Sequence, residues 1–312
     1  MDTLLEAKVD AIVGPASSGV AGLVIDRVSG ADAVLVSPAN PLASPPEGTR
    51  YFRTAPGDEL RGRAVADQLV AAKATKVAVV SREDPYGDRL GKATVDALQA
   101  AEVAATPITY NTETEAFGPV ADEIVAAKPD AVVLAGYTEI GQIVASLAGK
   151  GLGPSKVSTW LVPDRLDNVG EDLSSGTLAG VKGVIAGVKP DPGFLQRLQA
   201  IDPAVTDTTY AAETYDAVVL VALAAQSGRS DSPATIAATL PPVTQGPQEC
   251  TSVDACMDAL AQSRRVNYKG AAGLYKLNGE GEPTTGSFAV ETFGADNMPD
   301  ADGAAYVQAT AG

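Results

Sequence analysis

The segment Asp10-Ala11-Ile12-Val13-Gly14-Pro15-Ala16-Ser17-Ser18-Gly19 is the most informative part of this 312-residue chain. A short apolar strand ends in a turn of small and hydroxyl residues, and apolar residues at helical spacing follow directly. The segment therefore predicts a strand-to-helix connection at the carboxyl end of a parallel strand. Ser17 or Ser18 is placed to cap the helix, whose first N–H groups attract anions. Helix capping alone would also explain both serines.

Strand and helix patterns alternate along most of the chain. Strand-like runs cover residues 11–13, 33–36, 77–80, 131–135, 158–162 and 181–188, and helical patterns cover 60–72, 90–98, 120–127 and 140–147. This alternation predicts an α/β fold of βαβ units, in which the loops after parallel strands gather at one edge of each sheet. Further strands are expected at 273–277 and 287–293, and residues 295–312 are expected to form a loose tail.

The βαβ series is interrupted twice by segments rich in Pro or Gly. These segments lie near Thr54-Ala55-Pro56-Gly57 and near Val188-Lys189-Pro190, and each follows a predicted strand. They indicate connections between two lobes. We expect residues 1–55 and 189–280 to form lobe 1, and residues 56–188 and 281–312 to form lobe 2.

Composition excludes several functional classes. The net charge of −16 makes nucleic acid and anionic membranes poor partners. The chain has no histidine, which removes Ser-His-Asp and Cys-His nucleophile systems and the common zinc sites. No run of residues is long and apolar enough to cross a bilayer. We therefore expect no cofactor, no metal and no membrane span.

The two cysteines, Cys250 and Cys256, lack the spacing of a redox pair or of a zinc knuckle. The pattern favours a local disulfide, which would indicate an oxidising compartment. Two buried free thiols are the alternative.

Four further loops follow predicted strands in the same way as the first. Ser37-Pro38-Ala39-Asn40 offers a hydroxyl and backbone amides, and the later loops offer Tyr86, Tyr137 and Asp164. Hydroxyls and amides suit a carboxylate, and a carboxylate with tyrosine support suits an ammonium. Together the loops predict an α-amino-acid site. Surface packing of Tyr86, a rim position for Tyr137 and helix capping by Asp164 are the alternatives.

These motifs, in this order and spacing, resemble type I periplasmic solute-binding proteins. The similarity is greatest to the leucine/isoleucine/valine-binding branch of ABC importers. It extends over nearly the whole chain and includes Tyr210–Ala217 and Tyr268–Gly273. It implies two Rossmann-like lobes with parallel-sheet cores, joined by a three-segment hinge that closes on a ligand.

The resemblance also implies roles for single residues. Ser18, assisted by Ser17, would hold the ligand carboxylate together with backbone amides near Ala39 and Asn40. Tyr86 and Tyr137 would line the opposite wall, and Asp164 would bind the ammonium. Two residues depart from the branch, because Asn40-Pro41 replaces a usual threonine and Asp164 is one methylene shorter than the usual glutamate.

The family usually begins with a further strand, helix and strand, so an upstream segment carrying an export signal is expected. The predicted function is that of an extracytoplasmic binding protein, periplasmic or a cell-surface lipoprotein. It would act as a monomer that captures an amino acid or similar small polar solute for ABC permease subunits, and would not be an enzyme. A ligand-sensing module of the same fold and an α/β enzyme are the alternatives.

Overall fold

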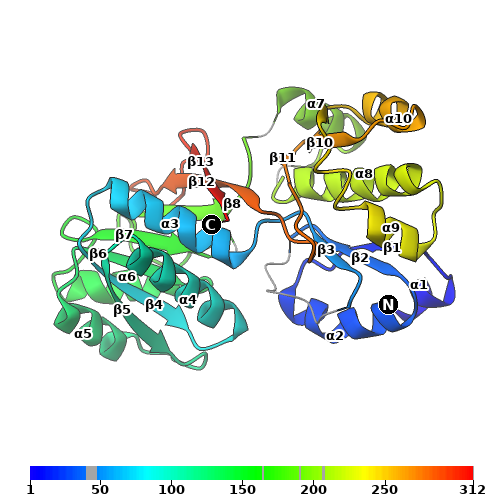
Figure 1. The fold of residues 1–312 in the computed structure, drawn as a ribbon. Helices are drawn as coiled ribbons and strands as arrows, with labels where there is room; N and C mark the ends of the chain where they lie inside the picture. Colours follow the sequence, from blue (N-terminus) through cyan, green and yellow to red (C-terminus); the bar gives the residue numbers. More distant parts are fainter. Residues whose placement is uncertain (40–47, 164, 190, 206–207, 312) are drawn as a thin grey trace. The chain divides into compact units, whose positions relative to one another are not determined.

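The computed structural model describes residues 1–39, 48–163, 165–189, 191–205 and 208–311 (Figure 1), and leaves the side chain of Ser18 undescribed. The chain divides into two compact units. Unit 1 comprises Met1–Gly57, Gly187–Ser287 and Thr310–Gly312, and unit 2 comprises Asp58–Ala186 and Phe288–Ala309. Among the described residues, no helix has the length and apolar character needed to cross a bilayer.

Unit 1 contains two small sheets with their helices. Its elements are α1 (Asp2–Glu6), β1 (Ala11–Val13), α2 (Ser18–Gly30), β2 (Val34–Ser37), β3 (Tyr51–Arg53), α7 (Pro192–Ile201), α8 (Ala211–Gly228), α9 (Pro233–Thr239), β9 (Gln248–Cys250), α10 (Val253–Ala261), β10 (Val266–Gly270) and β11 (Gly273–Leu274). Strands β1, β2 and β3 form a parallel sheet in that order. In the second sheet, β10 lies between β9, to which it is parallel, and β11, to which it is antiparallel.

Unit 2 is built on one seven-stranded sheet. Its elements are α3 (Asp58–Ala71), β4 (Lys76–Arg82), α4 (Pro85–Ala100), β5 (Ala104–Tyr110), α5 (Gly118–Ala127), β6 (Ala131–Ala135), α6 (Ile140–Gly149), β7 (Ser158–Val162), β8 (Lys182–Ala186), β12 (Thr285–Thr292), which begins in unit 1, and β13 (Ala305–Thr310), whose last residue returns to unit 1. The strand order is β13-β12-β8-β7-β6-β4-β5, with β8 to β5 parallel and β12 antiparallel to β8.

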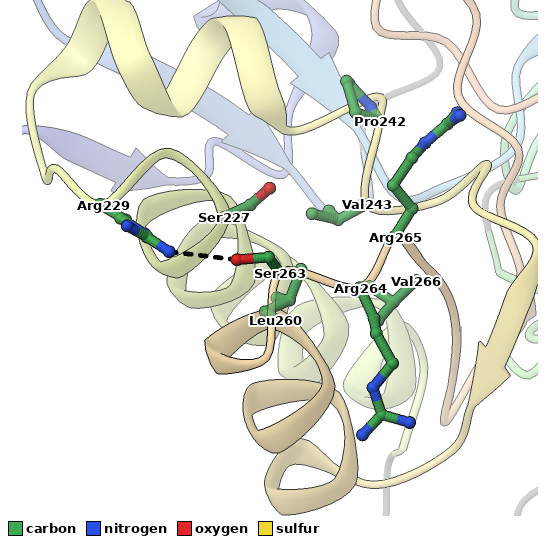
Figure 2. Close-up of a pocket in the computed structure, with 9 residues that line it drawn as sticks. All are labelled: Ser227, Arg229, Pro242, Val243, Leu260, Ser263, Arg264, Arg265 and Val266. Carbon is green, nitrogen blue, oxygen red and sulfur yellow. Dashed lines mark hydrogen bonds between the residues drawn. The ribbon is translucent and has the colours of Figure 1, made fainter.

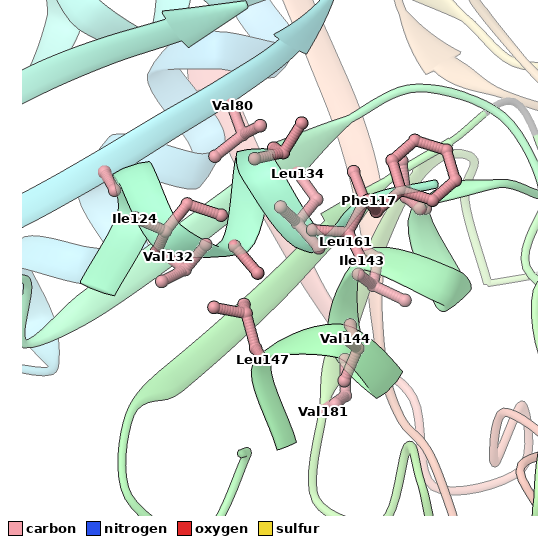
Figure 3. Packing of buried hydrophobic residues seen from close by; sticks show 14 of the residues in the cluster. Val80, Phe117, Ile124, Val132, Leu134, Ile143, Val144, Leu147, Leu161 and Val181 are labelled. Atoms are coloured by element: carbon pink, nitrogen blue, oxygen red, sulfur yellow. The ribbon is translucent and has the colours of Figure 1, made fainter. Parts of the chain in front are cut away.

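The core of unit 2 lies between the sheet and the pair α5 and α6 (Figure 3). Val80, Val132 and Leu134 project from neighbouring strands toward Ile143 and Leu147 of α6. Strand residues two apart share a face of the sheet, and helix residues four apart share a face of the helix. Apolar residues at these spacings therefore make one continuous buried layer, which fixes the register of each strand.

The alternating pattern located most of these elements. The strands expected at 11–13, 131–135 and 158–162 are confirmed at those residues. The expectation for the C-terminus was wrong, because residues 295–312 include β13, which joins the sheet beside β12. Strand β5 was not predicted from the sequence, because it contains Pro107, which has no backbone N–H. β5 lies at an edge of the sheet, where such a residue is tolerated.

The observed unit boundaries differ from the expected ones most at the C-terminal end. Residues 281–287, expected in lobe 2, belong to unit 1 because Gly281 accepts a backbone hydrogen bond from Arg53 (3.0 Å) and Glu282 pairs with the buried Arg53 side chain. The chain returns to unit 1 at Thr310, and the N–H of Ala311 donates to the carbonyl of Thr284 (2.8 Å). The chain therefore passes between the units four times, against the three passages expected.

Candidate functional site

The expected site residues lie in both units. Asn40 and Asp164 lie outside the described residues. Ser17, Ser18 and Ala39 belong to unit 1, and Tyr86 and Tyr137 belong to unit 2. Their roles in ligand binding stay predictions.

In unit 1 the loops after β1 and β2 meet at the carboxyl edge of the parallel sheet. Ser17 is the N-cap of α2, and its hydroxyl accepts a hydrogen bond from the N–H of Val20 (3.4 Å). The hydroxyl of the fully buried Ser37 donates to the carbonyl of Pro15 (2.6 Å), which ties the end of β2 to the loop that precedes α2. Ala39 follows and is buried.

This arrangement gives the unit 1 edge the character of an anion site. The first N–H groups of a helix have no partner within the helix, and the dipole of α2 adds positive potential at its start. Ser17 satisfies one of these groups, and its side chain is exposed. The geometry suits a small anion, and helix capping accounts for the hydrogen bond that Ser17 makes.

In unit 2 two of the expected residues are brought together. The rings of Tyr86 and Tyr137 stack with centroids 5.3 Å apart and planes inclined by 19°. Tyr86 begins α4 after β4, and Tyr137 follows β6, the strand next to β4 in the sheet. Adjacent parallel strands thus deliver both rings to the same edge.

The two tyrosines differ in exposure and in their polar contacts. Tyr86 is 4% exposed, and its hydroxyl donates to the carbonyl of Val162 (2.7 Å) while it accepts from buried Arg61 (3.1 Å). Tyr137 is half-buried, and the guanidinium of Arg82 lies 5.2 Å from its ring centroid. Tyr86 therefore anchors the end of β7, whereas Tyr137 presents the more accessible ring.

Glu139 is the centre of a polar network that the sequence analysis missed. The residue is the N-cap of α6 but makes no side-chain capping bond. Its Oε1 accepts hydrogen bonds from the hydroxyl of Tyr110 (2.8 Å), the N–H of Tyr137 (3.2 Å) and Arg82 (3.2 Å).

Arg82 and Tyr110 occupy equivalent places, since each is the last residue of its strand. Arg82 also donates to Asp84 (2.7 Å), the residue that caps α4. Burial lowers the pKa of Arg82, but its hydrogen bonds to Glu139 and Asp84 outweigh that effect and raise the pKa above its ordinary value. Burial and the Glu139 charge raise the pKa of the Tyr110 hydroxyl, so Tyr110 is a hydrogen-bond donor at neutral pH.

Gly136 makes this network possible. A Cβ atom at Gly136 would lie 2.2 Å from the hydroxyl oxygen of Tyr110 and 2.9 Å from Oε1 of Glu139. A side chain there would separate the donor from its acceptor. The signal that could have revealed these residues is their position, because polar residues that end parallel strands lie at the ligand-binding edge of α/β sheets.

A second polar network lies in unit 1 around Asp216 of α8. Its carboxylate accepts four hydrogen bonds, from the hydroxyls of Tyr268 (2.8 Å) and Tyr275 (2.6 Å) and from the N–H groups of Ala271 and Ala272 (both 2.8 Å). Asp216 is fully buried, and burial raises its pKa while the hydrogen bonds oppose the rise. This network fixes the β10–β11 hairpin on α8.

The described residues also include a disulfide but no cluster suited to a metal ion. Cys250 and Cys256 form a disulfide, with their Cα atoms 5.4 Å apart. Across the described ranges, no three His, Cys, Asp or Glu residues are grouped so that they could hold a metal ion.

Comparison with known proteins identifies the fold and the family. A sequence profile described as Periplasmic binding protein matches residues 1–247. The chain is 27% identical to the chemotactic signal transduction system substrate-binding protein BasB of Halobacterium salinarum, over 88% of this chain and 68% of BasB.

Two solved structures illustrate the fold. The branched-chain amino acid transporter substrate-binding protein LivJ of Streptococcus pneumoniae, in complex with isoleucine, superposes with a TM-score of 0.72 at 19% identity, covering 98% of this chain and 82% of LivJ. An ABC transporter solute-binding protein from R. palustris, in complex with benzoate, has a TM-score of 0.66 at 17% identity, covering 100% of this chain and 81% of that protein.

Proposed function

This chain belongs to the periplasmic binding protein family, and from that premise we propose that it captures an amino acid for an ABC importer. Membership of the family implies an extracytoplasmic location. The relatives and structural neighbours are binding proteins, and we infer that this chain likewise binds its solute without turning it over.

One observation carries the proposal. Tyr137 is held at the carboxyl edge of the unit 2 sheet by Tyr86 on one side and by Arg82, and its backbone N–H is bound by Glu139. A ring fixed by this many contacts is a preformed apolar wall with polar groups beside it, the composition of a site for a small polar solute. The start of α2, with the exposed Ser17, supports the carboxylate half of the proposal, because the first N–H groups of a helix favour an anion.

The ligand class follows from charge. An α-amino acid needs donors for its carboxylate and an acceptor for its ammonium. Ser17, Ser18 and the start of α2 supply donors in the proposal, and Asp164 supplies the acceptor.

A thermal-shift screen tests the proposal directly. The purified chain is heated with each common amino acid and with benzoate, since a ligand that prefers the folded state raises the melting temperature. A saturable rise with an aliphatic amino acid supports the proposal. A rise with benzoate alone would replace the ligand class, and chemical conversion of any ligand would overturn the binding-protein role.

The Asp164→Ala variant tests the ammonium acceptor. Loss of a charge-assisted contact weakens binding of the amino acid found in the screen by about tenfold or more. Calorimetry measures the change, with Asp96→Ala as the control because Asp96 is an exposed carboxylate on α4 that pairs with Lys92. Equal affinity of both variants and the unmodified chain would reject the role of Asp164.

Sensing is a second candidate function. The relative BasB is named as part of a chemotactic signal transduction system, which favours a chain that reports its ligand to a receptor. Deletion of the coding sequence distinguishes the two roles. Loss of solute uptake supports transport, whereas loss of the behavioural response with normal uptake supports sensing.

A further inference from the structure

A pocket of about 330 Å³ opens in unit 1 (Figure 2). Residues from the end of α8, the end of α10 and the start of β10 line it. Val243, Leu260 and Val266 are its apolar lining and are buried, at 1%, 8% and 1% exposure. The hydroxyls of Ser227 and Ser263 add polar groups.

Every charged residue that lines this pocket is an arginine. Arg229, Arg264 and Arg265 contribute three positive charges, and no carboxylate lines the pocket. The concentration is unusual in a chain with a net charge of −16. A local reversal of charge in an acidic protein concentrates anions at that place.

Among the residues that the structure describes, the three arginines have no carboxylate partner. Arg229 donates to the hydroxyl of Ser263 (3.2 Å), and Arg264 donates to the amide oxygens of Gln248 (3.3 Å) and Gln262 (2.9 Å). Within the described ranges, Arg265 makes no hydrogen bond or ion pair. Six other arginines of the described chain do pair with carboxylates, namely Arg27, Arg50, Arg53, Arg82, Arg89 and Arg165.

Helix ends explain part of this arrangement. The carbonyl groups at the C-terminus of a helix attract cations, and Arg229 is the C-cap residue of α8. Arg264 and Arg265 follow α10, and their side chains extend in opposite directions (Figure 2). The positive charges are therefore spread over the lining of the pocket and do not gather at one helix end.

We propose that this pocket binds a small organic anion with two or more carboxylate or phosphate groups, whose carbon skeleton contacts Val243, Leu260 and Val266. Guanidinium groups bind both kinds of anion through paired N–H donors. Three arginines spread over the lining match a ligand with several anionic groups better than one with a single group. The volume is at the lower end of the range for small-molecule sites, which limits the ligand to a few carbon atoms. The proposal is independent of the amino-acid site.

Calorimetry with two probes tests the proposal and separates the two ligand chemistries. Citrate represents the carboxylates, inorganic pyrophosphate represents the phosphates, and acetate is the single-charge control. The Arg265→Gln variant is used first, because Arg265 has no described hydrogen bond whose loss would affect folding. Arg264→Gln/Arg265→Gln is the stronger variant, and melting temperatures without probe verify that both variants fold.

Arg197→Gln is the matched control. Arg197 lies on α7 in the same unit, and its guanidinium lies 5.8 Å from the ring centroid of Phe194. We expect saturable binding of citrate or pyrophosphate, little binding of acetate, and a loss of affinity of about tenfold or more in the double variant. Arg197→Gln should change affinity by less than about twofold.

Three results would overturn the proposal. They are no saturable binding of either multivalent probe, equal binding of acetate, and an equal loss in Arg197→Gln, which would indicate attraction to overall charge. Tighter binding of citrate than of pyrophosphate assigns the pocket to carboxylates, and the reverse assigns it to phosphates. These results can be interpreted even if the amino-acid screen fails, because the pocket is tested with other ligands and other variants than the amino-acid site.

Discussion

Two carboxylates organise polar networks in this protein, Asp216 in unit 1 and Glu139 in unit 2. Asp216 is fully buried and accepts hydrogen bonds from four uncharged donors. Glu139 is about a fifth exposed and accepts from Tyr110, a backbone N–H and the charged Arg82. A fully buried acceptor with several uncharged donors stabilises the fold, whereas an ion pair at a sheet edge with about a fifth of its side-chain surface exposed remains partly accessible to solutes.

The largest expected effect is the loss of the Asp216 carboxylate. Asp216→Ala leaves buried hydroxyl and N–H donors without an acceptor, and we expect the free energy of unfolding to fall by roughly 3–5 kcal/mol. Urea denaturation measures this change. Asp231→Ala, an exposed carboxylate in the same unit, should change it by less than about 0.5 kcal/mol. Similar values for the two variants would end the comparison between the networks.

The pH dependence of stability tests Glu213, which precedes Asp216 by one helical turn. Burial, assisted by the Asp216 charge, raises the pKa of Glu213 from 4.5 to about 7. The folded protein therefore holds this proton between pH 4.5 and 7 while the unfolded chain releases it, so stability falls as pH rises through that range. The fall attributable to Glu213 is about 3 kcal/mol.

The Glu213→Gln variant isolates that contribution. Its free energy of unfolding, measured by denaturation at several pH values, should fall less between pH 5 and pH 7 than that of the unmodified protein, by about 2 kcal/mol. Identical slopes would show that Glu213 titrates normally.

The disulfide should act on the same unit as Asp216. Cys250 lies opposite Tyr268 in the β9–β10 pair, and Tyr268 is one of the donors to Asp216. Removal of the disulfide in Cys250→Ser/Cys256→Ser should lower the free energy of unfolding by roughly 2–3 kcal/mol, the value for closure of a short loop. Ligand affinity should not change. A loss of affinity would connect the disulfide to the site.

The smallest expected effect belongs to Glu139. Glu139→Gln keeps an acceptor oxygen for Tyr110 and Tyr137 but removes the charge that pairs with Arg82. We expect a change in the free energy of unfolding below about 1 kcal/mol, and a loss of affinity of about two- to fivefold for the solute found in the screen. A loss of stability as large as that of Asp216→Ala would give both networks the same structural role.

The sequence by itself determined the α/β class, most strands of the parallel sheets and the family resemblance. These features depend on local spacing, because a strand buried on both faces is a continuous apolar run and its helix repeats every three to four residues. The loops after those strands placed Tyr86 and Tyr137 at one sheet edge before their stacking was visible. Each of these predictions used only the spacing of residues that are close together in the sequence.

Only the tertiary structure decided which residues are the hydrogen-bond partners of Glu139 and Asp216. Glu139 accepts hydrogen bonds from Arg82 and Tyr110, which end two different strands. Asp216 accepts hydrogen bonds from a hairpin whose tyrosines lie 52 and 59 residues later in the chain. Strand β13 forms beside β12, although it lies in a stretch rich in Ala, Gly and Asp that predicted a loose tail. Such contacts depend on strand order and on the register of packing, which a single sequence does not encode at local range.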